Sequence, residues 1–170
     1  SLERIREEFA RVVGAELDAS WAIHDAKDSH RMMVMVSRQG HCLNDLLHRV
    51  RTGSIRAQIV AVVSNHQDLR DVVEWHGIPF HHVPVSPETK LEAEAELRTL
   101  ISEHRAQSVV LARYMQVLSH DLCRDLTGRA INIHHSLLPS FKGARPYFQA
   151  HTRGVKVIGA TAHYVTTDLD

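Results

Sequence analysis

The fold of this chain is decided by the stretch Asn132-Ile133-His134-His135-Ser136-Leu137-Leu138-Pro139. Because the side chains of a strand alternate between its two faces, Asn132, His134 and Ser136 are expected to share one face. Apolar residues precede the stretch, and a loop rich in glycine and proline follows it, from 139 to 146. The polar triplet is therefore expected at the carboxyl end of a strand, where open α/β sheets bind their ligands.

The spacing of this triplet also suits chemistry on a carbonyl group. An amide and an imidazole two residues apart can both point at one developing oxyanion, or at one proton in transfer. The alternative is structural: Asn132 would cap a turn, and His134 would be a histidine whose hydrogen bonds are satisfied within the fold. Short motifs often match by chance, so the triplet alone leaves both interpretations open.

Outward from this stretch, short apolar runs alternate with helical patterns along most of the chain. The apolar runs predict strands at 32–36, 59–63, 80–83, 109–112, 130–134 and 157–165. Helical spacing predicts helices at about 42–51, 68–76, from 87 onward, 121–126 and 146–153. Continuous runs of Val, Ile, Leu and Met between helices indicate an α/β fold: a Rossmann-like, mostly parallel sheet with helices on both faces.

The long helix has a recognisable start. Ser86 is expected to cap it, Pro87 to take its first helical position, and Glu88 to place an acid in its first turn. The residues expected on its buried side are Leu91, Ala95, Leu97, Leu100 and Ile101.

The first 29 residues form a separate pattern. Residues 2–17 have the apolar spacing of a helix, 20–24 could be a short strand, and 25–29 are a polar linker. This part is too small to bury its own apolar stripe. We therefore expect it to belong to a larger unit or to dock on the main body.

Composition narrows the class of protein. The 170 residues fit one domain with a fragment of another, and a hydrophobic content of 44% supports a proper core. Twenty basic and twenty acidic residues give a net charge of zero, which lends little support to a nucleic-acid or membrane partner. No apolar run is long enough to span a membrane, and the N-terminus does not resemble a signal peptide. We expect a soluble, cytoplasmic protein.

Metals and nucleotide cofactors receive no support either. The 14 histidines include no HExxH motif, and the doublets His81-His82 and His134-His135 would place their members on opposite strand faces. Two cysteines are too few for a zinc ribbon or a disulfide framework. The turn at 37–44 has one glycine, so it is neither a dinucleotide fingerprint nor a P-loop, although a helix N-terminus there could hold a small anion. No metal and no cofactor are expected.

Three segments together resemble the folate-dependent formyltransferase-fold enzymes: VLARYMQVLS (110–119), the stretch 131–143, and GATAHYVTTDLD (159–170). The resemblance runs from about residue 30 to the end, and it is strongest to the members that remove the formyl group by hydrolysis. It implies a formyltransferase-like catalytic domain at 28–170, apparently truncated at its C-terminal end. It also implies that 1–27 are the C-terminal part of an ACT-like regulatory domain of the α+β class, with its linker.

The resemblance implies a catalytic site made by Asn132, His134 and Asp170. Asn132 would stabilise the oxyanion, a protonated His134 would be a second donor and the proton source for the departing nitrogen, and Asp170 would keep His134 charged or take a proton from the attacking water. Without the resemblance, Asp170 would be read as a solvated terminal acid. The expected substrate-binding residues are Met115, Gln116, Val117, Leu118, His135, Ser136, His163 and Thr166.

The implied reaction is hydrolysis of 10-formyltetrahydrofolate to tetrahydrofolate and formate, which would supply purine biosynthesis, in a homo-oligomer. Related transferases pass the formyl group to an amine such as glycinamide ribonucleotide and carry Gly-Ser-Asn where this chain has Gly40-His41-Cys42. They usually have a proline in place of His135. Both departures favour water as the acceptor of the formyl group, and the zero net charge argues against tRNA as the acceptor. The alternatives are a formyltransferase with such an amine acceptor and a non-catalytic folate-binding or regulatory protein, against which the three polar groups argue.

Overall fold

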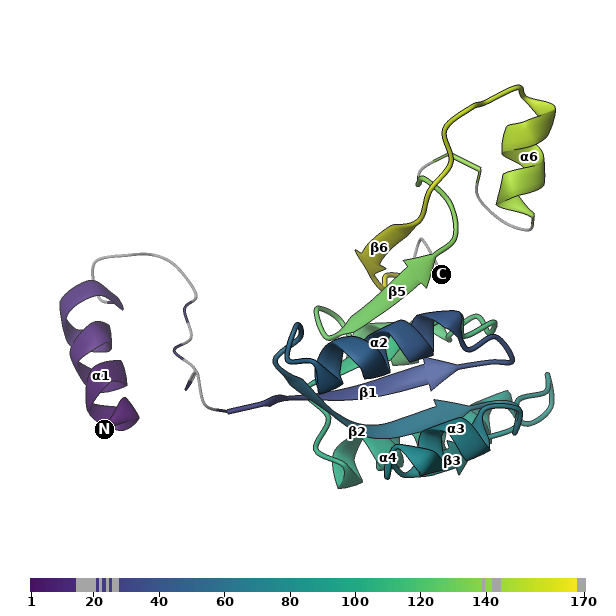
Figure 1. The fold of residues 1–170 in the computed structure, drawn as a ribbon. Coiled ribbons are helices and arrows are strands. Elements are labelled where there is room, and N and C mark those ends of the chain that lie inside the picture. Colours follow the sequence, from purple (N-terminus) through teal and green to yellow (C-terminus); the bar gives the residue numbers. More distant parts are fainter. Residues whose placement is uncertain are drawn as a thin grey trace.

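A computed structural model describes residues 1–14, 21, 23, 25, 28–138, 140, 141 and 145–167. Six strands form one sheet in the order β3-β2-β1-β4-β5-β6 (Figure 1). They are β1 (His30–Val36), β2 (Ala57–Ser64), β3 (Phe80–His82), β4 (Ser108–Leu111), β5 (Ala130–His134) and β6 (Thr161–Tyr164). Strands β1 to β5 pair in parallel, and β6 pairs with β5 in the antiparallel direction. The predicted mostly parallel α/β sheet is confirmed.

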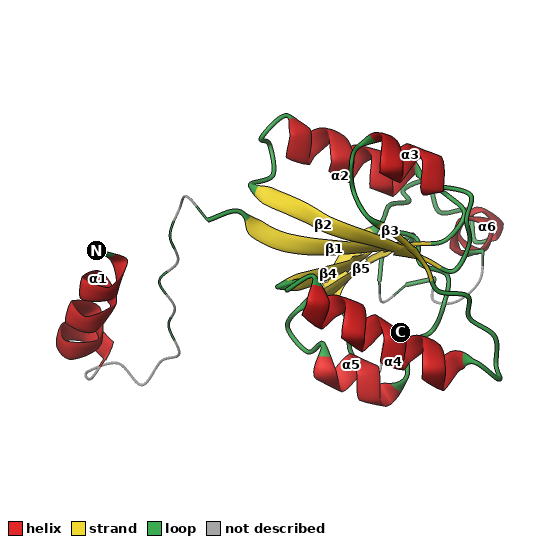
Figure 2. Ribbon diagram, turned by 90° about the horizontal axis from the view of Figure 1, so that it is seen from below, coloured by secondary structure: helices red, strands yellow, loops and turns green. Residues whose placement is uncertain are grey.

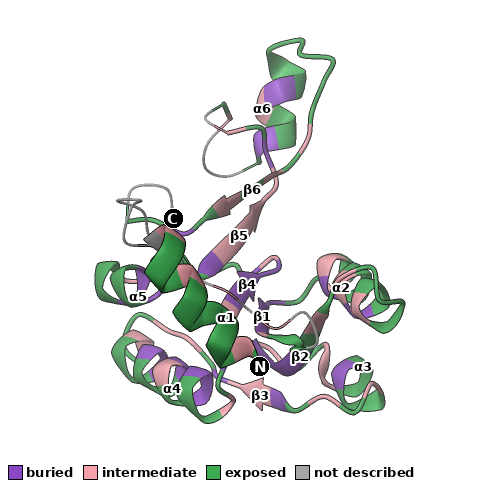
Figure 3. Cartoon of the chain, turned by 90° about the vertical axis from the view of Figure 1, so that its left-hand side faces the viewer, coloured by how far each residue is buried: buried purple, intermediate pink, exposed green. Residues whose placement is uncertain are grey.

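Helices cover both faces of this sheet. Helices α2 (His41–Arg51) and α3 (Arg70–Trp75) lie on one face, and α4 (Lys90–Glu103) and α5 (His120–Asp125) lie on the other (Figure 2). The sheet separates two apolar cores. On the α2 side Val34 and Val62 pack with Leu43, and on the α4 side Met33 and Met35 pack with Leu97. Burial on both faces explains why the β1 and β2 segments are continuous apolar runs (Figure 3).

The buried side of α4 differs from the prediction. Leu91 is 80% exposed and Ala95 is exposed as well. The residues that face the core are Ala93, Glu94, Leu97, Leu100 and Ile101. A helical period of 3.6 that starts from the three confirmed positions, Leu97, Leu100 and Ile101, reaches 93 and 94 but not 91 or 95.

The start of α4 also differs, although its capping chemistry is present. The helix begins at Lys90 rather than at Pro87, because 87–89 form a turn first. Ser86 nevertheless accepts a hydrogen bond from the Thr89 N–H (3.2 Å), and the Thr89 hydroxyl accepts one from the Ser86 N–H (3.0 Å). These reciprocal bonds have the form of a capping box placed around the turn.

The last strand is shorter than predicted. β6 covers Thr161–Tyr164, whereas a strand was expected at 157–165. The ladder with β5 ends where His134 pairs with Thr161, so the residues before 161 extend past the end of their partner strand. Helix α6 (Pro146–Thr152) lies beyond this end. An apolar run therefore gave the place of this strand but not its length.

The N-terminal part is described only in pieces. Helix α1 (Leu2–Phe9) continues as a short π-helix, η1 (Ala10–Gly14), and 15–20 lie outside the described residues. Of the predicted strand at 20–24 only Trp21 and Ile23 are described, and neither is in a strand. Helix α1 has no buried residue and lies apart from the sheet in Figure 1. The boundary between 1–27 and 28–170 stays a prediction, as does the ACT-like origin of the first part.

Candidate active site

The pairing of β5 with its neighbours gathers the predicted polar residues on one face of the sheet. Asn132 lies opposite His163, and His134 lies opposite Thr161. Residues opposite each other in a ladder point to the same side. This side is the α4 face, because Asn132 also pairs with Leu111, whose side chain belongs to the core beneath α4. The predicted common face of Asn132 and His134 is confirmed.

Histidine rings meet at the end of β5. The ring of His134 lies 5.3 Å from that of His135 and 6.3 Å from that of His163, measured between centroids. His135 lies one residue past the end of the β5 ladder at His134, so its predicted place on the opposite strand face stays a prediction. The ring centroid of His135 also lies 6.0 Å from that of Tyr147 in α6.

The tautomer of His163 follows from its hydrogen bond. Its Nδ1 lies 2.9 Å from the carbonyl oxygen of Tyr164, and a carbonyl can only accept, so Nδ1 carries the proton. In the neutral ring Nε2 is then the atom that can accept a proton. Among the described residues, no group of three or more His, Cys, Asp or Glu side chains is arranged to hold a metal ion.

Ser136 turns into a buried position just after the strand. Its side chain is 3% exposed, and its hydroxyl has no hydrogen-bond partner within the described part of the chain. Its carbonyl accepts a hydrogen bond from the Thr161 hydroxyl (2.7 Å), which in turn accepts one from the Leu138 N–H (3.0 Å). Thr161 thus fixes the turn, and the Ser136 hydroxyl is available to a polar ligand atom or a water molecule.

The segment after β4 combines buried ends with an exposed middle. Tyr114 and Leu118 are 7% and 5% exposed and belong to the core on the α4 side. Between them Met115 and Val117 are 58% and 64% exposed. Among the described residues, no main-chain hydrogen bond is made by Gln116 or Val117. The middle of the segment therefore offers unpaired peptide groups, at Gln116 and Val117, beside the exposed side chains of Met115 and Val117.

Arg113, which the sequence did not single out, is near enough to His135 for its charge to act on that ring. Its backbone has φ 66°, and its guanidinium donates two hydrogen bonds to Gln39 Oε1 (2.9 and 3.2 Å). Burial, the charge of Arg113 and the charge of His134 lower the pKa of His135, in that order. His135 is therefore held toward its neutral form. No pattern in the sequence points to Arg113, because the contact joins three different loops.

Two further residues missed by the sequence connect the loops at the carboxyl end of the sheet. The Ser37 hydroxyl follows β1, donates to Asn65 Oδ1 after β2 (2.7 Å) and accepts from the Met115 N–H after β4 (2.9 Å). Ser37 and Asn65 are 3% and 8% exposed. The available signal was a polar residue close behind each of two buried apolar runs: Ser37 directly after Val36, and Asn65 two residues after Val63.

The remaining predicted residues lie toward the end of the chain. Thr166 is exposed and follows Val165, which is buried in the core on the α4 side. Asp170 lies outside the described residues, so its predicted approach to Asn132 and His134 stays a prediction.

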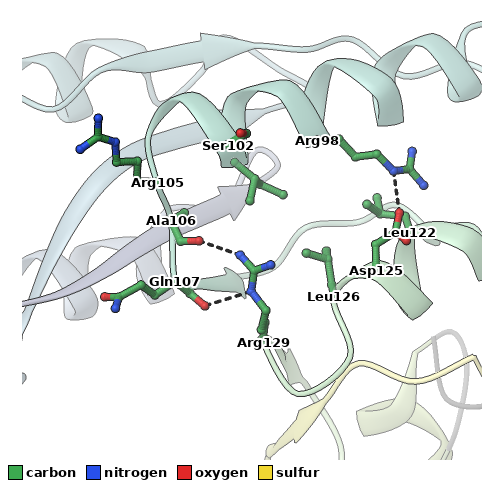
Figure 4. A pocket seen from close by; sticks show the side chains of 10 residues that line it. Arg98, Ser102, Arg105, Ala106, Gln107, Leu122, Asp125, Leu126 and Arg129 are labelled. Carbon is green, nitrogen blue, oxygen red and sulfur yellow. Dashed lines mark hydrogen bonds and ion pairs between the residues drawn. The ribbon is translucent and has the colours of Figure 1, made fainter. Parts of the chain in front are cut away.

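A hollow of about 700 Å³ lies elsewhere, between α4 and α5 (Figure 4). Arg129 donates there to the Ala106 and Gln107 carbonyls (2.8 and 3.3 Å), and Arg98 bonds Asp125 (2.7 Å). These residues precede β4 and β5 or line the adjoining helices. The hollow is therefore at the amino end of the sheet, opposite the polar residues of β5, and two of its arginines, Arg98 and Arg129, bond internal partners.

Comparison with known proteins shows the family to which this chain belongs. Residues 30–170 match the formyl transferase family along their whole length. The chain belongs to the formyl transferase family. Among members of this family, a formyltetrahydrofolate deformylase of Corynebacterium sp. (strain P-1) is 53% identical over 169 residues, which cover 99% of this chain and 59% of that protein.

Solved structures of formyl transferase family members agree with the fold. A formyltetrahydrofolate deformylase from Pseudomonas syringae pv. tomato has a TM-score of 0.94 and 52% identity, covering all of this chain and 57% of that one. A phosphoribosylglycinamide formyltransferase from Coxiella burnetii has a TM-score of 0.77 and 30% identity, covering 84% and 68%. The chain thus spans somewhat more than half the length of these deformylases. No helix among the described residues is long and apolar enough to cross a membrane.

Proposed function

We propose that this protein hydrolyses 10-formyltetrahydrofolate to tetrahydrofolate and formate. The observation that carries the proposal is the common face of Asn132, His134 and His163 at the carboxyl end of β5, close to the segment 115–118, in which Gln116 and Val117 make no main-chain hydrogen bond to the described residues. The similarity to deformylases, at 53% and 52% identity, favours water over an amine as the acceptor.

In the proposed reaction, water adds to the formyl carbon and the carbonyl oxygen becomes an oxyanion. The Asn132 amide and a protonated His134 donate to that oxyanion, and Asp170 takes a proton from the attacking water. The C–N bond then breaks, and His134 gives its proton to the departing nitrogen of tetrahydrofolate. The remaining fragment leaves as formate. His163, whose Nδ1 is held by the Tyr164 carbonyl, supports the imidazole of His134 from the neighbouring strand.

The substrate-binding residues are assigned in the same proposal. The pteridine end would lie on the segment Met115, Gln116, Val117 and Leu118, mainly against main-chain atoms, because the peptide groups in its middle are open. His135, Ser136 and Thr166 would border the site, and the buried hydroxyl of Ser136 would meet a polar substrate atom. We further propose that the enzyme needs no cofactor, acts in the cytoplasm as a homo-oligomer, and releases formate for purine biosynthesis.

The test is formate release by the full-length protein from 10-formyltetrahydrofolate without any acceptor. Asn132→Ala should lower kcat by about 10²–10³-fold, the usual effect of removing one oxyanion donor. Asn44→Ala, which changes an exposed amide on α2, is the matched control and should leave kcat unchanged. Transfer to glycinamide ribonucleotide that is faster than formate release would reverse the choice of acceptor. Folate binding without turnover would support the non-catalytic alternative.

A further inference from the structure

Glu94 lies on the buried side of a helix, and only 4% of this acidic residue is exposed. It lies in α4 between Ala93 and Leu97, which are buried in the same core. A buried acid is unfavourable unless its oxygens receive hydrogen bonds. Both oxygens of Glu94 are used by one partner: Ser119 donates its N–H to Oε1 (2.8 Å) and its hydroxyl to Oε2.

Ser119 ends the segment that follows β4 and begins the next helix. Its hydroxyl also accepts a hydrogen bond from the Leu122 N–H (3.2 Å), so that Ser119 is the N-cap of α5. The hydroxyl thus donates to Glu94 and accepts from the helix at the same time. A contact made only to cap α5 would not require the buried carboxyl group, because a serine cap is complete with its own oxygen.

The same segment is held at its other end by Ser37. The Ser37 hydroxyl accepts from the Met115 N–H, and the Ser119 N–H reaches Glu94 four residues later. Between these two anchors lie the open peptide groups of Gln116 and Val117. Burial, and after it the charge of Glu94, raise the pKa of Tyr114 at the start of the segment to about 12. Glu94 therefore bonds the end of the segment and acts electrostatically on its beginning.

We propose that Glu94 is a positioning residue that holds the segment 115–118 in the conformation that binds folate. This inference rests on the proposed function only for the identity of the ligand. Glu94 does not touch the reacting atoms. It acts through Ser119, by fixing the distance between the two anchors and so the direction of the peptide groups between them. A loosened segment would bind folate less well, because the ordering lost in the free protein would have to be regained on binding.

The test compares Glu94→Gln and Ser119→Ala in the full-length protein, with the dissociation constant of tetrahydrofolate and the kinetics of formate release as readouts. Each variant should raise the dissociation constant and KM at least tenfold and change kcat less than threefold. The double variant should bind no worse than Ser119→Ala alone, because both changes remove the bond from the Ser119 hydroxyl to the Glu94 carboxylate, while Ser119→Ala also removes the cap of α5. Ser119→Thr keeps the hydroxyl and should retain most of the affinity.

Two controls separate positioning from loss of stability. Glu92→Gln removes an exposed acid from the same helix, and Leu47→Ala weakens the core on the other face of the sheet. Neither should change the dissociation constant of tetrahydrofolate at a temperature where the variant is folded. Amide hydrogen exchange supplies a readout without folate: the Met115 and Ser119 amides should exchange faster in Glu94→Gln than in Leu47→Ala.

The outcomes also distinguish this inference from the proposed function. If the wild-type protein releases formate and Glu94→Gln binds tetrahydrofolate as tightly as the wild type, the positioning role is wrong and the function stands. If the wild type binds tetrahydrofolate but releases no formate, the function is wrong, and the effect of Glu94→Gln on binding still decides the positioning role. A wild type that does not bind tetrahydrofolate overturns both.

Discussion

The neighbourhood of His135 shows how one side chain changes the chemistry of another. The imidazole lies near the guanidinium of Arg113 and the ring of His134, and it is partly buried. Burial and both neighbouring charges disfavour the protonated ring, so its pKa falls. His135 is therefore held toward its neutral form beside His134.

Arg113→Gln should therefore raise the pKa of His135, because it removes a positive charge and leaves the burial in place. The imidazole proton signals, followed by NMR across pH 4 to 8, measure the change (about the range in which histidine titrates). Arg105→Gln is the matched control, since Arg105 also has a left-handed backbone (φ 48°) but follows α4 at the other end of the sheet. An unchanged titration of His135 in Arg113→Gln would contradict the assigned cause.

For single residues, the sequence predicts those positions that follow from the alternation of side chains in a strand or from the 3.6-residue period of a helix. Alternation along β5 was enough to place Asn132 and His134 on one face, and the register of β6 then added Thr161 and His163. Glu94 also had a signal, an acid three residues before a buried leucine on a helix. Arg113 had none, because its contacts join loops that are distant in sequence and are brought together by the sheet.

The turn before α4 illustrates how local bonds define an element. Ser86 and Thr89 exchange main-chain to side-chain hydrogen bonds around the turn 87–89. Ser86→Ala should lower the free energy of unfolding by about 1 kcal/mol, the typical contribution of such a cap. Urea denaturation measures it, with Ser102→Ala on the exposed side of α4 as the control. An equal effect of the two substitutions would remove the special role of Ser86.

The contact between β3 and the end of α4 makes stability depend on pH. His81 Nε2 lies 2.9 Å from His104 Nε2, and burial and the charge of His104 lower the pKa of His81 more than Glu103 and Glu96 raise it. Below pH 6.5 His81 is protonated in the unfolded chain, whereas in the folded chain its lower pKa keeps it neutral to a lower pH. Stability should therefore decrease as pH falls from 6.5 toward the lower pKa of the folded state.

His81→Gln should make this part of the pH profile flatter, because the group with different proton affinity in the two states is removed. The free energy of unfolding by urea at several pH values between 7.5 and 5 measures the slope (about the range set by an ordinary histidine pKa). His48→Gln, on the exposed side of α2, controls for the loss of a histidine as such. A steeper decrease in His81→Gln than in the wild type would show the opposite sign.

The elements as a whole were predictable where burial is complete. The strands at 32–36 and 59–63 were found to within two residues, because a strand covered on both faces must be apolar throughout. The predicted bounds were wrong where the end of an element depends on contacts with another segment. The length of β6 depends on where β5 ends, and the first turn of α4 depends on bonds that a helical period does not contain.

Across the whole molecule, burial decreases from the centre of the sheet toward β6. Strands β1 and β2 are buried over most of their length, β5 is mostly half-buried, and β6 alternates between half-buried and exposed residues. The exposed large apolar residues around β6 and α6 include Tyr147, Phe148, Val157, Ile158 and Tyr164. The proposed site lies between these regions, with Asn132 and His134 on β5 and His163 on β6.

Native-state hydrogen exchange of residues 1–170 should therefore give β6 a lower opening free energy than β1 and β2. Within the described residues, β6 pairs with one strand only, over four positions, whereas β1 has a partner on each side. Such an edge can open without unfolding the core. Met33→Ala, which removes a fully buried side chain, should lower the free energy of global unfolding by about 2–5 kcal/mol.

The same Met33→Ala variant decides whether β6 opens locally. For amides of β1 and β2, the opening free energy should fall by as much as the free energy of global unfolding, because these amides exchange only when the sheet unfolds. Amides of β6 should keep their exchange rates, because a local opening does not break contacts of Met33. If β6 loses as much protection as β1, the edge opens only with the core. His163 would then be as rigidly placed as Asn132, and the proposed site would be preorganised on both of its strands.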